Sequence, residues 1–466
     1  MFILLKLPHT SWHKIQGLKL HFLSETSSVI VLILLLSVSG LIWIILLTAW
    51  GQFWRCDQRL DTSLEGAAAL LAPYPKIAAV IPARNEAEVI ATSVNSLLNQ
   101  DYPGELCLWV VDDQSEDGTA TIVQDLARTV DLPGDLAGQQ SGKGGGKRAG
   151  KRSLQVLPGQ PLPTGWTGKL WALEQGTQRA IHPQEPDSVP DYLWLTDADI
   201  AHAPHSLSQL VQKAVQKPKD DPPADPQTDP QPIALVSLMV QLRCQSVWEK
   251  LLIPAFIFFF QKLYPFPWVN NPQKAVSAAA GGCILIQRSA LARIGGVAAL
   301  REALIDDCTL ATQVKCGAGK PYTPIWLGLS QDTLSLRAYD RLDSIWAMVA
   351  RTAYTQLNYS PLLLVGTIFG MGLVYLMAPI GVFYGLLHGW TQGQWSIAAL
   401  GFFIWGLMTI AYYPTVKLYK LSILWAMSLP LVAFLYTLMT IDSARQHWLG
   451  KGGAWKGRTY GHPKHP

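Results

Sequence analysis

The chain has few cysteines, and their spacing matches neither a metal site nor a disulfide framework. No C-x-x-C pair occurs among the 466 residues. Structural zinc sites and disulfide-rich folds both depend on closely spaced or regularly repeated cysteines, so neither is indicated. We expect buried or unreactive thiols in a reducing compartment. The six cysteines are Cys56, Cys107, Cys244, Cys283, Cys308 and Cys316.

Charge of one sign is also not in excess. The formal net charge is +4, and it is spread along the chain. Nucleic-acid-binding proteins gather basic residues into patches, so no nucleic-acid partner is predicted. Basic residues do gather in the C-terminal segment 442–466, together with Trp448 and Trp455. This composition is typical of a chain that lies on anionic lipid headgroups.

Long apolar runs, in contrast, are abundant. Hydrophobic residues make up 49% of the sequence. Residues 29–50 form a nearly unbroken run that contains no charge, is long enough to cross a bilayer, and lacks the cleavage site of a signal peptide. We expect a retained membrane anchor here. Three more charge-free runs lie at residues 361–387, 397–413 and 421–441.

Polar clusters follow three predicted strands. Residues 77–81, 106–111 and 192–195 are apolar runs typical of buried parallel strands, and acidic or amide side chains come soon after each. Open α/β sheets bind ligands at the carboxyl ends of their strands, so the pattern predicts a nucleotide site. The candidate residues are Pro82, Asn85, Glu86, Asp112, Asp113, Asp197 and Asp199.

Helix patterns alternate with these strands. Residues 88–98 and 119–129 each have the composition of a helix that begins after a polar cluster. This βαβα order predicts an α/β fold with a mostly parallel sheet and flanking helices. Two segments interrupt it: 134–152 is rich in Gly, Lys and Gln, and 217–232 is rich in Pro, Asp and Gln. Neither composition can form a packed core, so both are expected to be flexible surface insertions.

One further apolar segment, residues 248–268, is too short and too rich in proline to cross a membrane. It fits a helix in the membrane interface, where it would border the entrance for an acceptor, and a buried core helix is the alternative.

The predicted organisation is an N-terminal tail (1–27), an anchor (28–50), a catalytic domain (75–357), C-terminal transmembrane segments (361–441) and a basic aromatic tail (442–466).

Further motifs lie between and after these clusters. They are GWTGKLWA at residues 165–172, GGCILI at 281–286, IDDCTLA at 305–311 and WKGRxY at 455–460. Together with the polar clusters, they resemble the family 2 glycosyltransferases with a GT-A fold. The membrane segments at both ends make the chain most similar to the hopene-associated glycosyltransferases. The motif at 305–311 also resembles the third acidic motif of ceramide glucosyltransferases.

The resemblance implies transfer of a sugar from a nucleotide diphosphate sugar, typically a UDP-hexose, to a hydroxyl of a membrane lipid. Inversion at the anomeric carbon and a hopanoid or ceramide-like acceptor are implied with it. Asp199 and Asp197 would hold Mg²⁺ or Mn²⁺, because carboxylates one residue apart can share a divalent cation that neutralises a diphosphate. Asp112 and Asp113 would bind the base or the ribose of the nucleotide.

A catalytic base and two cations complete the implied site. Asp307 is the candidate base, because its neighbour Asp306 can raise its pKa. The alternative is that both acids only favour a helix N-terminus. Lys169 and Arg351 are candidates for holding the diphosphate. His202 follows the Asp197–Asp199 pair closely, but it is expected in a solvated loop rather than on a metal.

One motif departs from the family pattern. Related enzymes carry Q/R-x-x-R-W on a helix after the third acidic motif, and here the corresponding helix covers residues 344–356. Arg351 is present, but Thr352 and Met348 replace the Trp and the Gln or Arg. The usual role of this motif, which is to clamp the diphosphate and the acceptor, is therefore only half supported.

Three other functions remain as alternatives. A processive polysaccharide synthase would need the intact motif, and few spanning segments are left for its pore. A polyprenyl-phosphate sugar transferase is the second alternative. A non-catalytic membrane scaffold is disfavoured, because both the acidic pair and the third acidic motif are intact.

The membrane orientation raises a conflict. Nucleotide sugars are cytosolic, so the catalytic domain is expected on the cytoplasmic face of a membrane, in bacteria the inner membrane. Four spanning segments would then leave the basic C-terminal tail outside, against the positive-inside tendency. A re-entrant segment would resolve the conflict, and residues 421–441, interrupted by Pro430, are the candidate.

Overall fold

The computed structural model describes residues 9–60, 73–130, 150–183, 189–216, 232–450, 454–455 and 458–459. Side chains are described from residue 27 to residue 450 of these ranges. Most of the two predicted insertions, 134–152 and 217–232, lies outside the described residues. Within the predicted tail, β9 (Ala454–Trp455) pairs with β10 (Arg458–Thr459).

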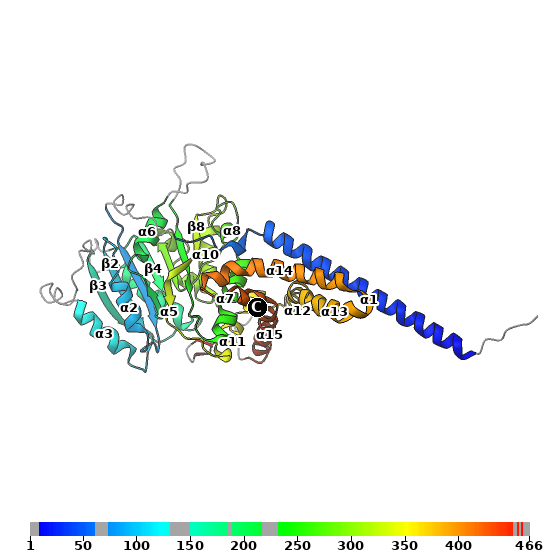
Figure 1. Cartoon of the computed structure of the whole chain (residues 1–466). Coiled ribbons are helices and arrows are strands. Elements are labelled where there is room, and N and C mark those ends of the chain that lie inside the picture. Colours follow the sequence, from blue (N-terminus) through cyan, green and yellow to red (C-terminus); the bar gives the residue numbers. More distant parts are fainter. Residues whose placement is uncertain are drawn as a thin grey trace, which may run out of the picture.

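An eight-stranded sheet forms the centre of residues 75–357 (Figure 1). Its strands are β1 (Ile77–Ala83), β2 (Leu106–Asp112), β3 (Arg152–Pro158), β4 (Tyr192–Thr196), β5 (Ile200–His202), β6 (Leu235–Gln241), β7 (Cys283–Gln287) and β8 (Ile325–Ser335). Their order is β3-β2-β1-β4-β7-β6-β8-β5. The first four run parallel, as predicted, and β6 pairs parallel with β8. The sheet is mixed, because β7 runs against both its neighbours and β5 against β8.

Helices cover both faces of this sheet. On one side lie α2 (Ile90–Leu98), α3 (Thr119–Val130) and α6 (Ser206–Val215), and on the other α5 (Gly168–Ile181) and α10 (Asp306–Cys316). All residues of β1 are buried as a result. Strands that are covered on both faces have continuous apolar sequences, and for this reason these strands could be predicted from the sequence. The helices predicted at 88–98 and 119–129 are α2 and α3.

Within the described ranges, four helical stretches are long and apolar enough to cross a membrane, and they lie to one side of the sheet (Figure 1). The first, Ser27–Thr48, belongs to α1 (His9–Thr48). The second contains α12 (Pro361–Met371), a π-helical segment η6 (Gly372–Leu376) and α13 (Met377–Gln392). The third is α14 (Trp395–Leu418), and the fourth joins η7 (Ile423–Ser428) to α15 (Leu429–Trp448). All four predicted apolar runs are therefore helical.

The apolar segment at 248–268 forms α7 (Val247–Leu263), with Pro254 inside it. Its middle is packed into the core, where Leu252, Ile253 and Phe258 are fully buried. Only its ends expose large apolar side chains, such as Leu263 at 54%. The buried-helix alternative therefore describes most of α7.

Helix α5 lies close to the sheet because Gly176 has no side chain. A Cβ at this position would lie 2.5 Å from Val80 Cγ1 and 2.9 Å from Val111 Cγ2. Such contacts force the helix away from the strands, so Gly176→Ala should lower the free energy of unfolding by about 1–3 kcal/mol. Thermal unfolding in detergent measures the change.

Gly366 in α12 provides the matched control, because a Cβ there would meet nothing within 4 Å. Gly366→Ala should be neutral or stabilise the protein by up to about 1 kcal/mol, since Ala favours helices over Gly. Equal stability of the two variants would contradict the close packing of α5 on β1 and β2.

Candidate active site

Two loops at the carboxyl ends of β1 and β2 hold each other in place. The first passes through Asn85, whose φ of 51° lies in the left-handed region that Asn tolerates. The Asn85 side-chain oxygen accepts a hydrogen bond from Glu116 N at 2.9 Å, and its backbone N–H donates to Ser115 Oγ at 3.0 Å. Glu86 N donates to Thr119 Oγ1 at 2.9 Å. Asn85 therefore fixes the loop that carries Glu86.

Asp112 and Asp113 follow directly in the second loop. Asp112 Oδ2 accepts a hydrogen bond from Ser115 N at 3.2 Å, while Oδ1 is buried and meets no donor among the described residues. A buried acceptor without a donor is rare, so a ligand N–H or O–H would fit here. The side chain of Asp113 is nearly inaccessible, at 1% exposure, and Pro82 is buried within β1. Of the two acids, Asp112 is the less buried.

The Asp197–Asp199 pair follows β4, and each acid meets a different cation. Asp197 Oδ1 lies 2.8 Å from Lys169 Nζ, and Asp199 Oδ2 lies 2.7 Å from Arg337 Nε. Burial raises the pKa of the Asp197 carboxyl, although the Lys169 charge offsets part of this effect. Each carboxylate thus uses one oxygen in its ion pair and keeps a second oxygen for another ligand.

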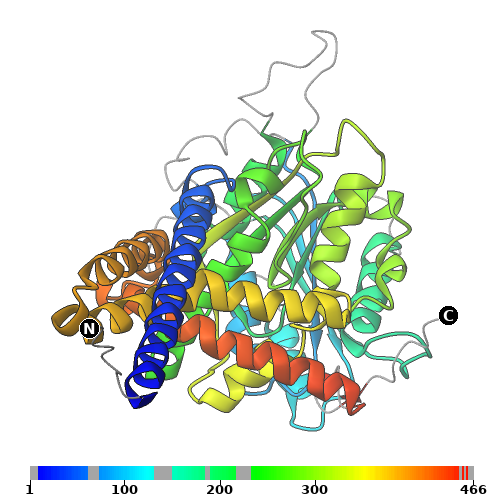
Figure 2. The ribbon, with the colours of Figure 1, turned by 90° about the vertical axis from the view of Figure 1, so that its right-hand side faces the viewer.

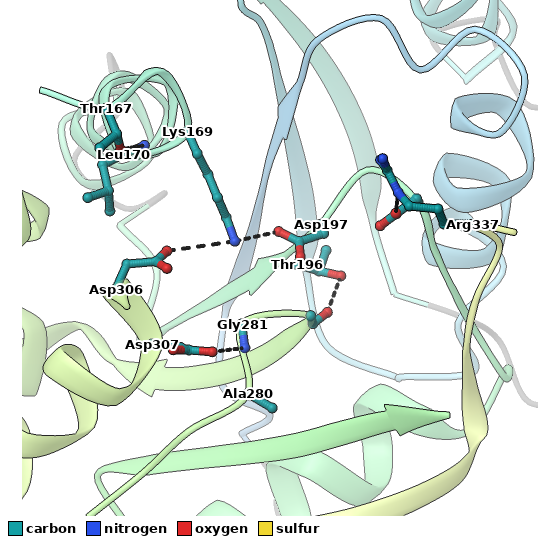
Figure 3. A network of polar contacts seen from close by, with 12 residues as sticks. Thr167, Lys169, Leu170, Thr196, Asp197, Ala280, Gly281, Asp306, Asp307 and Arg337 are labelled. Atoms are coloured by element: carbon teal, nitrogen blue, oxygen red, sulfur yellow. Dashed lines mark hydrogen bonds and ion pairs between the residues drawn. The ribbon is translucent and has the colours of Figure 1, made fainter. Parts of the chain in front are cut away.

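Lys169 joins this pair to a second pair of acids (Figure 3). Thr167 caps the start of α5, which places Lys169 in the first turn of the helix. From there Nζ reaches between Asp197 Oδ1, at 2.8 Å, and Asp306 Oδ2, at 3.7 Å. Burial alone would lower the pKa of Lys169, but the surrounding carboxylates raise it above its ordinary value. The ammonium group therefore stays charged.

Asp306 and Asp307 form the first turn of α10. Asp307 Oδ2 accepts a hydrogen bond from Gly281 N at 2.8 Å, and Oδ1 accepts one from Cys308 N at 2.7 Å. Burial and the adjacent Asp306 raise the pKa of Asp307 to about 6. The acids do occupy a helix N-terminus, and they also line the same pocket as Lys169 and Asp197.

Arg337 is a site residue that no sequence motif indicated. It follows β8 and holds two predicted acids at once, with Nε 2.7 Å from Asp199 Oδ2 and Nη2 2.8 Å from Glu86 Oε1. Burial would lower the pKa of Arg337, but these carboxylates raise it. The one sequence feature that points to Arg337 is its position after an apolar run. The predicted acidic residues have the same kind of position.

Arg351 lies apart from these acids. It is exposed at the end of α11 (Leu342–Ala350), where it lines a cleft of about 930 Å³. The same cleft is lined by Arg337, by Trp248 of α7 and by Trp346 of α11. Arg337 therefore belongs both to the acidic cluster and to the wall of the cleft, and the two adjoin at this residue.

The expectation that His202 lies in a solvated loop is wrong. His202 is on β5 and only 4% exposed, with Nε2 3.0 Å from Thr196 Oγ1 and its ring against Trp194. Burial lowers its pKa to about 3, so the ring is neutral. His202 is part of the core beneath the acidic pair, and no contact links it to a metal site.

The acidic cluster suits a divalent cation through its charge. Five carboxylates gather there, and four of them pair with the two cations Lys169 and Arg337. The described residues contain no group of three His, Cys, Asp or Glu side chains that could hold a metal alone. Two carboxylates with diphosphate and water oxygens are a usual shell for Mg²⁺, so the second oxygens of the Asp197–Asp199 pair fit this ion. The five carboxylates are Glu86, Asp197, Asp199, Asp306 and Asp307.

Two families of known proteins match this chain. Glycosyl transferase family 2 matches residues 78–150, and Glycosyl transferase family 21 matches residues 235–462. A curated relative, the beta-monoglucosyldiacylglycerol synthase of Synechocystis sp., is 42% identical over 55 residues, which cover 12% of each chain. The match thus spans about an eighth of that relative's length. Both matched families are glycosyltransferases, and the chain carries domains of this class.

Similar solved structures share little sequence with the chain. The mannosyltransferase PcManGT from Pyrobaculum calidifontis, in complex with GDP-Man and Mn²⁺, is 15% identical with a TM-score of 0.43, covering 80% of this chain and 97% of its own. The glucosyl-3-phosphoglycerate synthase from Mycobacterium tuberculosis, in complex with Mn²⁺ and UDP-glucose, is 17% identical with a TM-score of 0.33, covering 64% and 84%. The mixed sheet, its flanking helices and the apolar helices agree with the GT-A membrane enzyme expected from the sequence.

Arg337→Lys tests the clamp between Asp199 and Glu86. Lysine keeps the positive charge but cannot present the planar fork that bonds both carboxylates. Residues that support ligating side chains typically change activity by 10- to 100-fold, so kcat/KM for the sugar donor should fall by about that factor.

The control is Arg128→Lys, because Arg128 is exposed on α3 and, among the residues that the structure describes, pairs with its neighbour Asp125, at 2.7 Å. This exchange should leave transfer unchanged. The two variants are compared by their steady-state rates at varied donor concentration. If their rates are equal, Arg337 has no role in the active site.

Proposed function

We propose that the chain is an inverting glycosyltransferase that moves a sugar from a nucleotide diphosphate sugar, most simply a UDP-hexose, to a hydroxyl of a membrane lipid. One observation carries the proposal. Lys169 stands between Asp197 of the acidic pair and Asp306 of the pair that opens α10. A group suited to a metal–diphosphate and a group suited to proton transfer therefore share one pocket.

The donor would bind across the ends of β1, β2 and β4. Asp112, with its buried acceptor oxygen, would take a hydrogen bond from uracil or ribose. Asp113, Pro82, Asn85 and Glu86 would shape the wall around it.

The diphosphate end of the donor would lie at the Asp197–Asp199 pair. Mg²⁺ or Mn²⁺ held by Asp199 and Asp197 would offset the charge that builds on the leaving diphosphate. Lys169 and Arg337 hold the two carboxylates in position through their ion pairs. Either cation could also contact a phosphate oxygen from its present place.

Asp307 is the proposed base. Transfer forms a bond between the acceptor oxygen and the anomeric carbon and breaks the bond from that carbon to the diphosphate oxygen. The proton of the acceptor hydroxyl passes to the Asp307 carboxylate, whose pKa of about 6 lies closer to neutral pH than that of an ordinary carboxyl. The Gly281 N–H fixes Oδ2 at 2.8 Å. A single displacement of this kind inverts the configuration of the sugar.

The acceptor is proposed to enter through the cleft beside Arg337. Trp248, Trp346 and Met348 give this cleft apolar surface, and Arg351 gives it a cation. We assign Arg351 to the acceptor rather than to the diphosphate, because it lies in the cleft and outside the acidic cluster.

The relative's name refers to a glucosyldiacylglycerol, and the sequence resemblance refers to hopanoids and ceramide. All of these are bilayer lipids.

The proposed setting is a multi-pass membrane protein whose catalytic domain, residues 75–357, faces the cytoplasm, in bacteria at the inner membrane. Four long apolar helices support the membrane association. The cytoplasmic orientation follows from the cytosolic origin of nucleotide sugars. The segments 134–152 and 217–232 are proposed as flexible insertions of this domain, on their composition alone.

Transfer should depend on Mg²⁺ or Mn²⁺. Excess EDTA should abolish the transfer of labelled sugar to lipid, and the added metal should restore it, because the leaving diphosphate needs a cation. EDTA saturated with Mg²⁺ beforehand serves as the control and should have no effect. Full activity in excess chelator would show that the Asp197–Asp199 pair does not act by binding a metal.

Asp307→Asn should separate chemistry from donor binding. The exchange keeps the size of the side chain but removes its proton affinity, so turnover should fall by about 10² to 10⁴-fold while donor affinity survives. Single-turnover transfer and calorimetric titration with the sugar nucleotide measure the two quantities. Loss of affinity in step with activity would place Asp307 in the donor site. If both turnover and donor affinity are retained, Asp306 and Asp307 serve only to stabilise the N-terminus of α10.

The pH profile gives a second readout of the same prediction. A base must be unprotonated, so the rate should be low below pH 6, rise through about pH 6 and level off above it. Asp306→Asn removes a negative charge that raises the pKa of Asp307. The midpoint should therefore move to lower pH in this variant, with a milder loss of turnover than in Asp307→Asn. An unmoved midpoint would exclude Asp307 as the titrating group.

A further inference from the structure

We infer that the chain crosses the membrane three times, through α1, α13 and α14, and that α12 and α15 lie flat in the leaflet next to the catalytic domain. The chain beyond α15 then continues on the same side of the membrane as that domain. The inference rests on the geometry of the helices and does not depend on the donor, the acceptor or the metal.

The apolar helices point in two directions. In Figure 1, α14 runs alongside α1 away from the sheet, and the two helices pack against each other and against α13. Figure 2 looks along that direction, and there α12 (gold) and α15 (red-orange) run across the view in front of the sheet. α12 and α15 also pack side by side. If α1 and α14 follow the membrane normal, α12 and α15 lie close to the membrane plane.

Helix α15 is attached to the catalytic domain at two points in its middle part. Tyr436 Oη donates a hydrogen bond to the Leu252 carbonyl of α7 at 2.9 Å, and Asp442 Oδ2 accepts one from Trp346 Nε1 of α11 at 2.9 Å. These two attachments are about 9 Å apart along the helix axis. These contacts hold the middle part of α15 against the domain, and the direction of the helix across the view in Figure 2, beside α12, sets it at a steep angle to α14.

The sides of α12 and α15 that face away from the protein are apolar. Leu362 and Phe369 of α12 are 80% and 68% exposed, and Leu431 and Phe434 of α15 are 54% and 44% exposed. Exposed apolar surface of this extent on a membrane protein fits contact with lipid chains rather than water. The occupant of this surface is therefore the leaflet that α1 and α14 enter.

The change of direction between α12 and α13 has a visible cause. The π-helical segment η6 separates the two helices, and π-segments often mark bends. Within it, the Val374 carbonyl accepts a hydrogen bond from Trp43 Nε1 of α1 at 2.8 Å. This hydrogen bond holds the bend against α1, the first crossing helix. From the bend, α13 continues alongside α1.

Helices α13 and α14 form a hairpin that reaches the far side of the membrane. The turn between them is flanked by Trp390 and Trp395, whose rings lie 5.4 Å apart, and Trp390 is 87% exposed. Such aromatic pairs favour the membrane interface. At its other end α14 returns to the catalytic domain, where its Leu418 carbonyl accepts a hydrogen bond from Gln331 Nε2 at 3.0 Å. The hairpin therefore adds two crossings, and α15 adds none.

This topology removes the charge conflict that four crossings create. The sequence after α15 contains Lys451, Lys456, Arg458 and Lys464. With three crossings, these cations begin on the same side as the catalytic domain, and the C-terminal segment agrees with the positive-inside tendency if that domain is cytoplasmic.

Epitope tags in the full-length chain test the topology. One tag replaces the turn at Gly393, one is inserted at Gly319 of the catalytic domain, and one follows Pro466. When protease is added outside intact spheroplasts, we expect the tag at Gly393 to be cut and the other two to be protected until the membrane is permeabilised. Digestion of the tag after Pro466 with protection at Gly319 would mean that α15 crosses. Protection at Gly393 would mean that the hairpin does not.

A lysine exchange compares the depth of α15 with that of α14. Phe434 of α15 and Phe403 of α14 are exposed to similar extents, 44% and 55%. A lysine at Phe403 would lie within the bilayer core, so Phe403→Lys should reduce the membrane-inserted protein several-fold. At Phe434 the ammonium can reach the headgroups, and Phe434→Lys should insert like the wild type. Equal losses would place α15 across the bilayer, and loss of self-association in Phe434→Lys alone would assign this face to a second copy of the chain.

Discussion

The ion pair between Lys169 and Asp197 is the contact on which the site depends. Asp197, Asp306 and Asp307 come from a strand end and a helix start, and without a cation between them their charges would repel and favour protonation. Lys169 reaches this place because Thr167 caps α5 and because Gly176 lets α5 lie close to β1 and β2. The packing of one helix on the sheet therefore sets the electrostatics of the pocket.

The pocket and the membrane helices meet at the cleft that Arg337 borders. The cleft is lined by α7, α11 and the end of α15, and Arg337 joins it to the acidic cluster. With α12 and α15 flat in the near leaflet, a lipid can move sideways into this cleft without leaving the bilayer.

Sequence patterns predicted the parts of the fold that local order determines. An apolar run followed by acids defines a buried strand and its ligand-binding end, which is why Asp112 and Asp197 lie where expected. Arg337 could not be predicted, because its partners Asp199 and Glu86 are 138 and 251 residues away in the chain. The runs that form α14 and α15 are both charge-free, yet the helices point in different directions, because contacts with α7 and α11 hold α15. His202 was misjudged because a polar residue three positions after the turn at Asp199 gave no sign of the short strand β5.

The central claim is that this pocket transfers sugar to lipid, and one measurement tests it directly. The purified chain in lipid vesicles is incubated with Mg²⁺ and UDP-hexose labelled in the sugar, and the products are partitioned between water and organic solvent. The account predicts that label moves into the organic phase with wild-type protein and remains in water with Asp307→Asn. Label that binds the protein but never enters the lipid fraction, with any hexose or bilayer lipid tried, would contradict it.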